Sequence, residues 1–256
     1  MAAANATVAN TTSPKWWISI LLNALLFLTL SLISSASAQT TFMVRNRCRF
    51  TIWVGTQPGA GQAILENGGF VLTRGQSYSM SAPVGWSGRF WGRTDCKFDS
   101  TGHGSCATGD CGGSLQCKGA GGNPPATLVE ITLGKLDYYD VSLVDGFNVP
   151  VSICPSGGSG NCGSPSCTNN VNRLCPSALR VQNNGKVVGC KSACLAFGSP
   201  EFCCTGSYGS ADRCTPSTYA QMFKTACPSA YSYAFDDRTS IYTCSGARSY
   251  TVSFCH

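Results

Sequence analysis

The stretch GHGSCATGDCGGSLQC, residues 102–117, places three cysteines among glycines and small polar residues. Such a segment has too little apolar content to fold by itself, so we expect a small loop held by disulfides. Zinc is the other common use of closely spaced cysteines. It is disfavoured because the sequence has only two histidines, His103 and His256, and no pair of CxxC motifs. We therefore expect no metal and no cofactor.

All 17 cysteines of the 256-residue chain follow position 47. Before them come Lys15, an apolar run over residues 16–33 and small residues at Ala36 and Ala38, which is the pattern of a cleaved export signal. We predict a signal peptide over residues 1–38 and an oxidising compartment where eight disulfides form and one cysteine is left over. An uncleaved membrane anchor is the alternative, because the apolar run is about long enough to span a bilayer.

Charged residues are sparse, at 12% of the chain, and the formal net charge is +6. The basic residues are scattered and form no run typical of a nucleic-acid groove, so nucleic acid is not an expected partner. The sequence also lacks the Gly-x-Ser-x-Gly motif of serine hydrolases and a phosphate-binding loop. Residues 39–256 are enough for one large core, or for a core with a smaller lobe.

Alternating apolar residues predict β-strands around Phe42 and Val44 and around Ile52 and Val54. Similar segments follow at residues 88–94, 127–133, 138–144, 241–244 and 249–255, with Gly and Pro clusters between them. This organisation predicts a mainly β protein built as an antiparallel sandwich or barrel.

Between Cys162 and Cys227 the sequence is rich in cysteine and poor in aliphatic residues. It contains one clear helix signal, in which Thr215 is the candidate N-cap and Pro216 fits the first turn. The apolar residues of that helix fall on one face; they are Tyr219, Met222, Phe223 and Ala226. Disulfides should hold this lobe together.

The stretch 102–117 resembles the signature of the thaumatin-like family. Other matching motifs are NRC (46–48), GRTDC (92–96), DGFNVP (145–150), EFCC (201–204) and YSY (231–233), so the resemblance extends over residues 39–256. It implies a flattened antiparallel β-sandwich with a disulfide-rich helical lobe and a small disulfide-stapled loop domain. The expected boundaries are 39–93, 126–168 and 228–256 for the sandwich, 94–125 for the loop domain and 169–227 for the lobe.

The resemblance also implies the disulfide pairing. The expected pairs are Cys48–Cys255, Cys96–Cys106, Cys111–Cys117, Cys162–Cys244, Cys167–Cys227, Cys175–Cys190, Cys194–Cys203 and Cys204–Cys214. Cys154 is then the leftover residue. It is either a buried apolar thiol at the end of a strand or the partner in a disulfide between two molecules.

Antifungal members of the family carry an acidic cleft between sandwich and lobe. The resemblance assigns its floor to Arg93, Glu130, Asp140, Asp145 and Asp236. The alternative is structural: Arg93 forms an ion pair, Asp145 favours a turn before a glycine, and Asp236 lies in a solvated loop.

The strand pattern supports the cleft. Glu130 alternates with apolar neighbours, and so does Asp140, so both carboxylates should face away from the core. Clustered carboxylates repel one another and raise one another's pKa, which favours function over stability as their purpose. The hairpin that joins Glu130 to Asp140 is shorter than in many relatives, which makes the placement of Glu130 the least secure of the five.

Three functions are compatible with this sequence. The first is a non-catalytic plant defence protein whose cleft binds β-1,3-glucan of fungal cell walls, with a fungal membrane or a receptor as a further candidate partner. The second is a weak endo-β-1,3-glucanase that uses Glu130 as acid and Asp140 or Asp145 as base or nucleophile. The third is a protein-binding, sweet-taste or ice-binding surface. We expect a monomer in the extracellular space rather than the vacuole, because the sequence has no tail beyond Cys255-His256.

Overall fold

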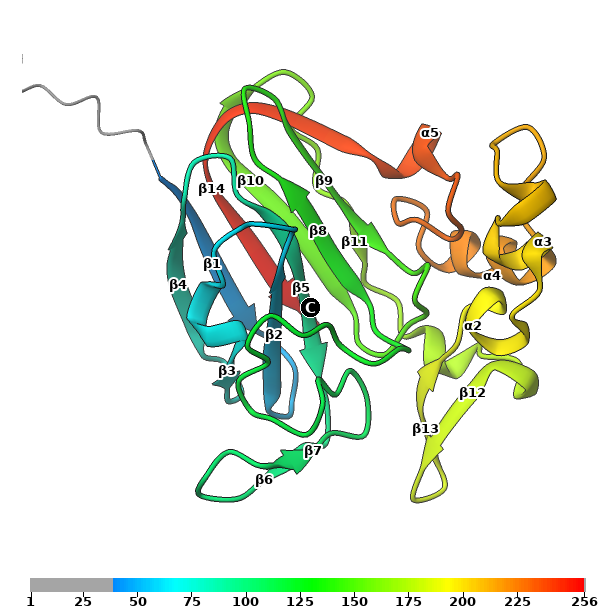
Figure 1. Cartoon of the computed structure of the whole chain (residues 1–256), viewed down its shortest axis with the longest axis horizontal. Helices are drawn as coiled ribbons and strands as arrows, with labels where there is room; N and C mark the ends of the chain where they lie inside the picture. The colour runs from blue at the N-terminus through cyan, green and yellow to red at the C-terminus, as the bar shows by residue number, and fades with distance from the viewer. Residues whose placement is uncertain (1–38, 256) are drawn as a thin grey trace, which may run out of the picture. The chain divides into compact units, whose positions relative to one another are not determined.

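The computed structural model describes residues 39–255, so the predicted signal peptide and His256 lie outside the described residues. The predicted mainly β fold is confirmed (Figure 1). The large sheet contains β1 (Thr40–Asn46), β2 (Ile52–Pro58), β3 (Gly69–Leu72), β4 (Ser77–Ala82), β5 (Ser87–Arg93), β8 (Leu128–Thr132), β9 (Asp137–Ser142), β10 (Val151–Ser159), β11 (Ser166–Cys167) and β14 (Tyr242–Phe254). Within residues 39–255, no helix is long and apolar enough to cross a membrane.

Strand β14 joins the two layers of the sandwich. The strand order is β11-β10-β14-β9-β8-β5-β2-β3, and β1 pairs with both β14 and β4. Residues 242–244 of β14 pair with β9, residues 245–254 pair with β10, and residues 249–254 also pair with β1. The sequence predicted two strands here; the structure has one, which passes through Gly246 at φ +66°, a conformation that glycine adopts readily. The β1–β14 pair is parallel, which departs from the predicted all-antiparallel arrangement.

Aromatic rings fill the space between the layers. Phe42 lies with its ring centroid 5.0 Å from that of Phe90 and 5.6 Å from that of Trp86. Tyr139 packs edge-on against Tyr250 at 5.1 Å. All five side chains are fully buried; four of them lie on strands, whereas Trp86 directly precedes β5. Burial of this aromatic surface stabilises the sandwich.

The smaller elements lie beside this sandwich. Two hairpins are β6 (Lys97–Phe98) with β7 (Gly104–Ser105), and β12 (Arg180–Asn183) with β13 (Lys186–Cys190); the helices are α2 (Ala193–Phe197), α3 (Pro200–Cys203), α4 (Thr218–Ala226) and α5 (Asp237–Ser240). The predicted N-cap of α4 is corrected from Thr215 to Ser217, whose hydroxyl accepts a hydrogen bond from the backbone N–H of Ala220 at 3.1 Å. Phe223 is buried on the predicted face.

All eight expected disulfides are present; they are Cys48–Cys255, Cys96–Cys106, Cys111–Cys117, Cys162–Cys244, Cys167–Cys227, Cys175–Cys190, Cys194–Cys203 and Cys204–Cys214. Cys154 is the free cysteine of the described residues, and it is exposed. The expectation of a buried thiol is therefore wrong. Cys154 lies on β10 opposite Thr251, with its side chain on the outer face of the layer.

Candidate functional site

A row of three charged residues crosses neighbouring strands on the face opposite the core. In the sheet register, Arg89 of β5 is opposite Glu130 of β8, and Glu130 is opposite Asp140 of β9. Cross-strand partners point to the same side of a sheet, which brings the three side chains together. An Nη2 atom of Arg89 lies 3.4 Å from Oε1 of Glu130. The predicted outward direction of Glu130 and Asp140 follows directly from the alternation of the two strands.

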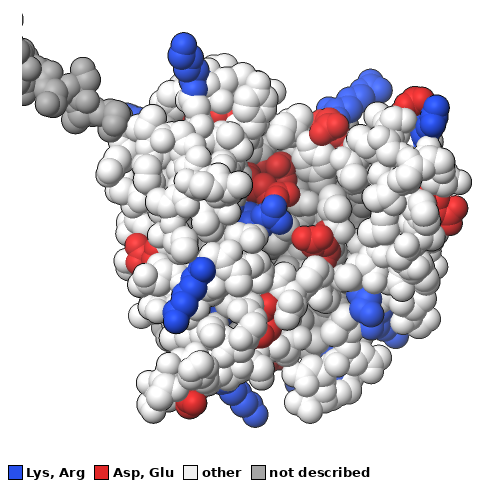
Figure 2. Space-filling model, in the orientation of Figure 1, with Lys and Arg blue, Asp and Glu red and all other residues white. Residues whose placement is uncertain are grey.

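This row forms one wall of an open pocket of about 440 Å³. The other charged residues that line it are Asp145, which follows β9, and Asp237, at the start of α5. Figure 2 shows acidic side chains gathered in a hollow of the molecular surface with a basic side chain among them. The pocket thus carries four carboxyl groups and one guanidinium, and its local charge is opposite in sign to that of the chain.

Asp140 is the carboxyl group of the pocket whose ionised form is most disfavoured by its surroundings. It is only 8% exposed, and its Oδ1 has no hydrogen-bond partner within the described residues. Burial, reinforced by the neighbouring charge of Glu130, raises the pKa of Asp140 to about 8. Burial also raises the pKa of Glu130, which Arg89 partly offsets. At mildly acidic pH the Asp140 carboxyl therefore holds its proton and can donate a hydrogen bond into the pocket.

The rim beside Asp140 comes from the segment that precedes α5. Tyr231 is attached to the end of β9, because its N–H donates to Val141 O and its carbonyl accepts from the Leu143 N–H, both at 2.8 Å. Its hydroxyl donates to Oδ1 of Asp237 at 2.6 Å. Burial, followed by this hydrogen bond to a carboxylate, raises the pKa of Tyr231, so the phenol stays protonated.

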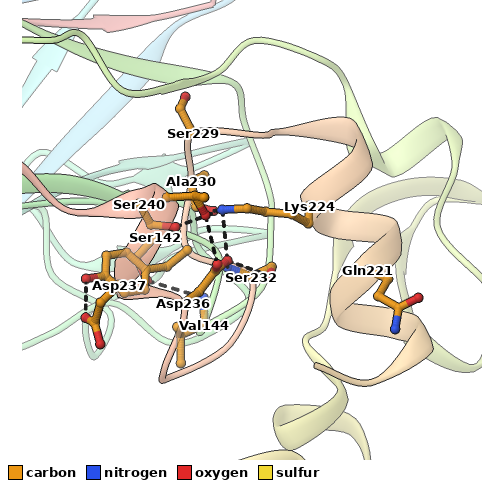
Figure 3. Close-up of polar contacts among 12 residues, drawn as sticks. Ser142, Val144, Gln221, Lys224, Ser229, Ala230, Ser232, Asp236, Asp237 and Ser240 are labelled. Carbon is orange, nitrogen blue, oxygen red and sulfur yellow. Dashed lines mark hydrogen bonds and ion pairs between the residues drawn. The ribbon is translucent and has the colours of Figure 1, made fainter. Parts of the chain in front are cut away.

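The assignment of Asp236 to the cleft floor is corrected. Asp236 is not among the residues that line the pocket. It forms an ion pair with Lys224 of α4 at 3.0 Å and accepts hydrogen bonds from the N–H and hydroxyl of Ser232 (Figure 3). Lys224 also donates to the carbonyl of Ala230 and the hydroxyl of Ser240. This network anchors residues 230–240 to the helical lobe. Asp237, the residue after Asp236, is the one that lines the pocket.

The assignment of Arg93 to the cleft floor is also corrected. Arg93 is fully buried and donates to four backbone carbonyls, those of Trp53, Val54, Ser114 and Leu115. It shares a face of β5 with Arg89, but the disulfide-stapled loop that contains residues 111–117 covers its end of the strand. Arg89 is left open at the other end, so it is the guanidinium of the pocket.

Sequence reasoning thus placed Glu130, Asp140 and Asp145 in one pocket and missed Arg89, Tyr231 and Asp237. Alternation along β5 could have suggested Arg89, because it lies an even number of residues from Arg93. Within residues 39–255, no three His, Cys, Asp or Glu side chains are arranged to hold a metal ion. The pocket can accept hydrogen bonds through its carboxylates and donate them through Arg89 and protonated Asp140.

The chain is similar to known proteins over most of its length. It is 55% identical over 222 residues to pathogenesis-related thaumatin-like protein 3.5 of Cryptomeria japonica, covering 87% of this chain and 92% of that protein. It is 56% identical over 237 residues to a thaumatin-like protein of Arabidopsis thaliana, covering 91% and 97%. A crystal structure of a laminaripentaose-producing β-1,3-glucanase in complex with laminaritetraose shares the fold, with a TM-score of 0.61 at 12% identity over 86% of this chain and 99% of that chain. The model of the thaumatin family matches residues 46–256, and the chain belongs to that family.

Proposed function

We propose that this protein is a secreted plant defence protein whose acidic pocket binds β-1,3-glucan of fungal cell walls. The observation that carries the proposal is the buried, unpartnered carboxyl of Asp140 beside Glu130 in an open pocket. A polar group left without a partner at low exposure costs stability, and a sugar hydroxyl could supply the missing hydrogen bond.

The chemistry of the pocket suits a neutral polyol. Carboxylates of Glu130, Asp145 and Asp237 accept hydrogen bonds from sugar hydroxyls, while Arg89 and protonated Asp140 donate them. Tyr138 lies on the same face of β9 as Asp140 and is 48% exposed, so its ring is free to lie against a pyranose face. These groups extend the binding surface along the strand.

Glu130→Gln and Asp140→Asn should each weaken binding to insoluble β-1,3-glucan roughly tenfold, because each substitution changes a hydrogen-bonding group inside the pocket. Co-sedimentation with the glucan measures the effect. Glu201→Gln makes the same chemical change on the exposed surface of α3 and serves as the matched control. Unchanged binding by both pocket variants would contradict the proposal.

Weak hydrolysis of the same glucan is a second candidate, favoured by the high pKa of Asp140 beside a second carboxyl. In this version Asp140, rather than Glu130, is the general acid, which reverses the roles expected from the sequence. Release of reducing sugar by the wild type, with a loss of release in Asp140→Asn far greater than the roughly tenfold weakening of binding, supports hydrolysis. If neither protein releases reducing sugar, hydrolysis is excluded and binding is the function that is left.

We further infer export after removal of residues 1–38. Eight disulfides support it, because they form and persist in oxidising compartments. N-terminal sequencing of the protein from the extracellular fluid should begin at Gln39. Recovery of the full-length chain in a membrane fraction would favour the uncleaved anchor instead.

A further inference from the structure

A second groove, of about 720 Å³, lies between the two short hairpins. Figure 1 shows β6–β7 and β12–β13 at the same end of the molecule, and both line the groove. The groove shares no lining residue with the acidic pocket. Its charged residues are Lys97, Lys186 and Asp95, so it is net basic where the other pocket is acidic.

Each wall of the groove presents one lysine beside one short polar residue. On the first hairpin Lys97 is opposite Ser105, and on the second Lys186 is opposite Asn183. Cross-strand partners share a face, and all four residues line the groove. Two hairpins that are far apart in the sequence therefore each direct an ammonium group and a short polar side chain, a hydroxyl on one and an amide on the other, towards one space.

Both walls are fixed by the covalent structure. The Cys96–Cys106 disulfide closes the first hairpin, and Cys175–Cys190 holds the end of β13. The second hairpin turns through two residues, Asn184 and Gly185, with φ of +48° and +75°. Positive φ at both positions is typical of the tight type I′ turn. A ligand would meet a preformed groove and would not have to order its walls.

The groove also contains Trp53, a half-buried aromatic side chain on the outer face of β2. Trp86 and Trp91 are fully buried, and their indole N–H groups donate to the carbonyls of Ala63 and Gly109. Among residues 39–255, the indole hydrogen bonds are those of Trp86 and Trp91, so Trp53 makes none, and the ion pairs involve neither Lys97 nor Lys186. An aromatic face and three free donors thus meet in one groove.

We propose that this groove binds an acidic oligosaccharide whose sugar rings carry carboxylates, that is, a polyuronate. Lys97 and Lys186 would each bind a carboxylate, and Trp53 would lie against a pyranose ring. Ser105 and Asn183 bond to sugar hydroxyls, and the carboxylate of Asp95 accepts from another. Cations on both walls favour a chain that carries several carboxylates over a neutral glucan.

Trp53 provides a direct measurement, because Trp86 and Trp91 are inaccessible to a quencher. The fluorescence of Trp53 is the part of the signal that is lost in Trp53→Phe. Acrylamide should quench this part less when a short oligogalacturonate is bound. Calorimetry with the same probe should show roughly fivefold weaker binding for Lys97→Ala or Lys186→Ala. Trp53→Leu should weaken binding roughly tenfold. Lys135→Ala, at an exposed lysine outside the groove, is the matched control and should bind normally.

Three outcomes would overturn the proposal. They are equal protection of Trp53 from acrylamide by a neutral laminari-oligosaccharide, equal weakening of oligogalacturonate binding by Lys135→Ala, and full competition by polyaspartate, which has the charge without the sugar ring. Glu130→Gln should leave oligogalacturonate binding unchanged while it weakens glucan binding. The two sites are therefore tested separately, and failure of one proposal does not decide the other.

Discussion

Replacing Asp140 by Asn is expected to stabilise the folded protein by on the order of 3 kcal/mol at pH 7 and to have little effect at pH 4. The folded state raises the pKa of this carboxyl from 3.8 to about 8. Between these values the folded chain holds a proton that the unfolded chain has released. The free energy of unfolding of the wild type therefore falls as the pH rises through this window, whereas the Asn side chain does not ionise.

Chemical unfolding of wild type and Asp140→Asn at pH 4 and pH 7 measures this effect. Asp145→Asn makes the same change at a less buried carboxyl of the same pocket and is the matched control. Parallel stability–pH profiles for wild type and Asp140→Asn would show that Asp140 ionises normally in the fold. Lower stability of Asp140→Asn at pH 7 would show that its carboxylate has a partner.

A carboxyl that reduces stability at neutral pH is typical of a site shaped for a ligand. The charge of Glu130 adds to the burial that raises the pKa of Asp140, and the charge of Asp145 adds to the burial that raises the pKa of Glu130, so the carboxyl groups of the pocket influence one another. The expected combination of higher stability and weaker glucan binding in one variant is the trade-off that functional sites show. If the carboxyl had a purely structural role, its replacement by an amide would lower the stability of the protein.

The strand period was enough to predict which way Glu130 and Asp140 point, because alternation depends only on local backbone geometry. It could not choose between Arg89 and Arg93, which share one face of β5. That choice depends on where the loop of residues 111–117 lies, which is a tertiary contact. In the same way, Asp236 and Asp237 are adjacent in sequence, and only the position of Lys224 decides which of them turns to the pocket.

The basic groove could not have been predicted from the sequence. Its two lysines lie in segments that are far apart in the chain, and each appears there as a single surface cation. Only the folded structure brings Lys97 and Lys186 to the groove that Trp53 also lines. The pairing of the cysteines came from the family resemblance, since spacing alone leaves many alternatives open.

Arg93→Lys is expected to destabilise the protein by about 4 kcal/mol, because the guanidinium is the connector between the sandwich and the disulfide-stapled loop. One buried side chain donates to Trp53 and Val54 on β2 and to Ser114 and Leu115 in the loop. Lysine has a single nitrogen and cannot reach acceptors on both sides in this fork geometry. Burial lowers the pKa of Arg93 only to about 10, so the wild-type side chain stays charged at neutral pH.

A fall in melting temperature of about 10 °C would match this loss in a chain of this size. Limited proteolysis should show cleavage appearing first within residues 102–117, because that loop loses its attachment to β2.

Arg89→Lys is the matched control. Arg89 lies on the same face of the same strand but is open to solvent, and its substitution should leave the melting temperature within a few degrees of wild type. At a temperature where both variants are folded, glucan binding should change with Arg89→Lys and persist with Arg93→Lys. The reverse pattern would show that Arg93, and not Arg89, contributes to glucan binding in the pocket.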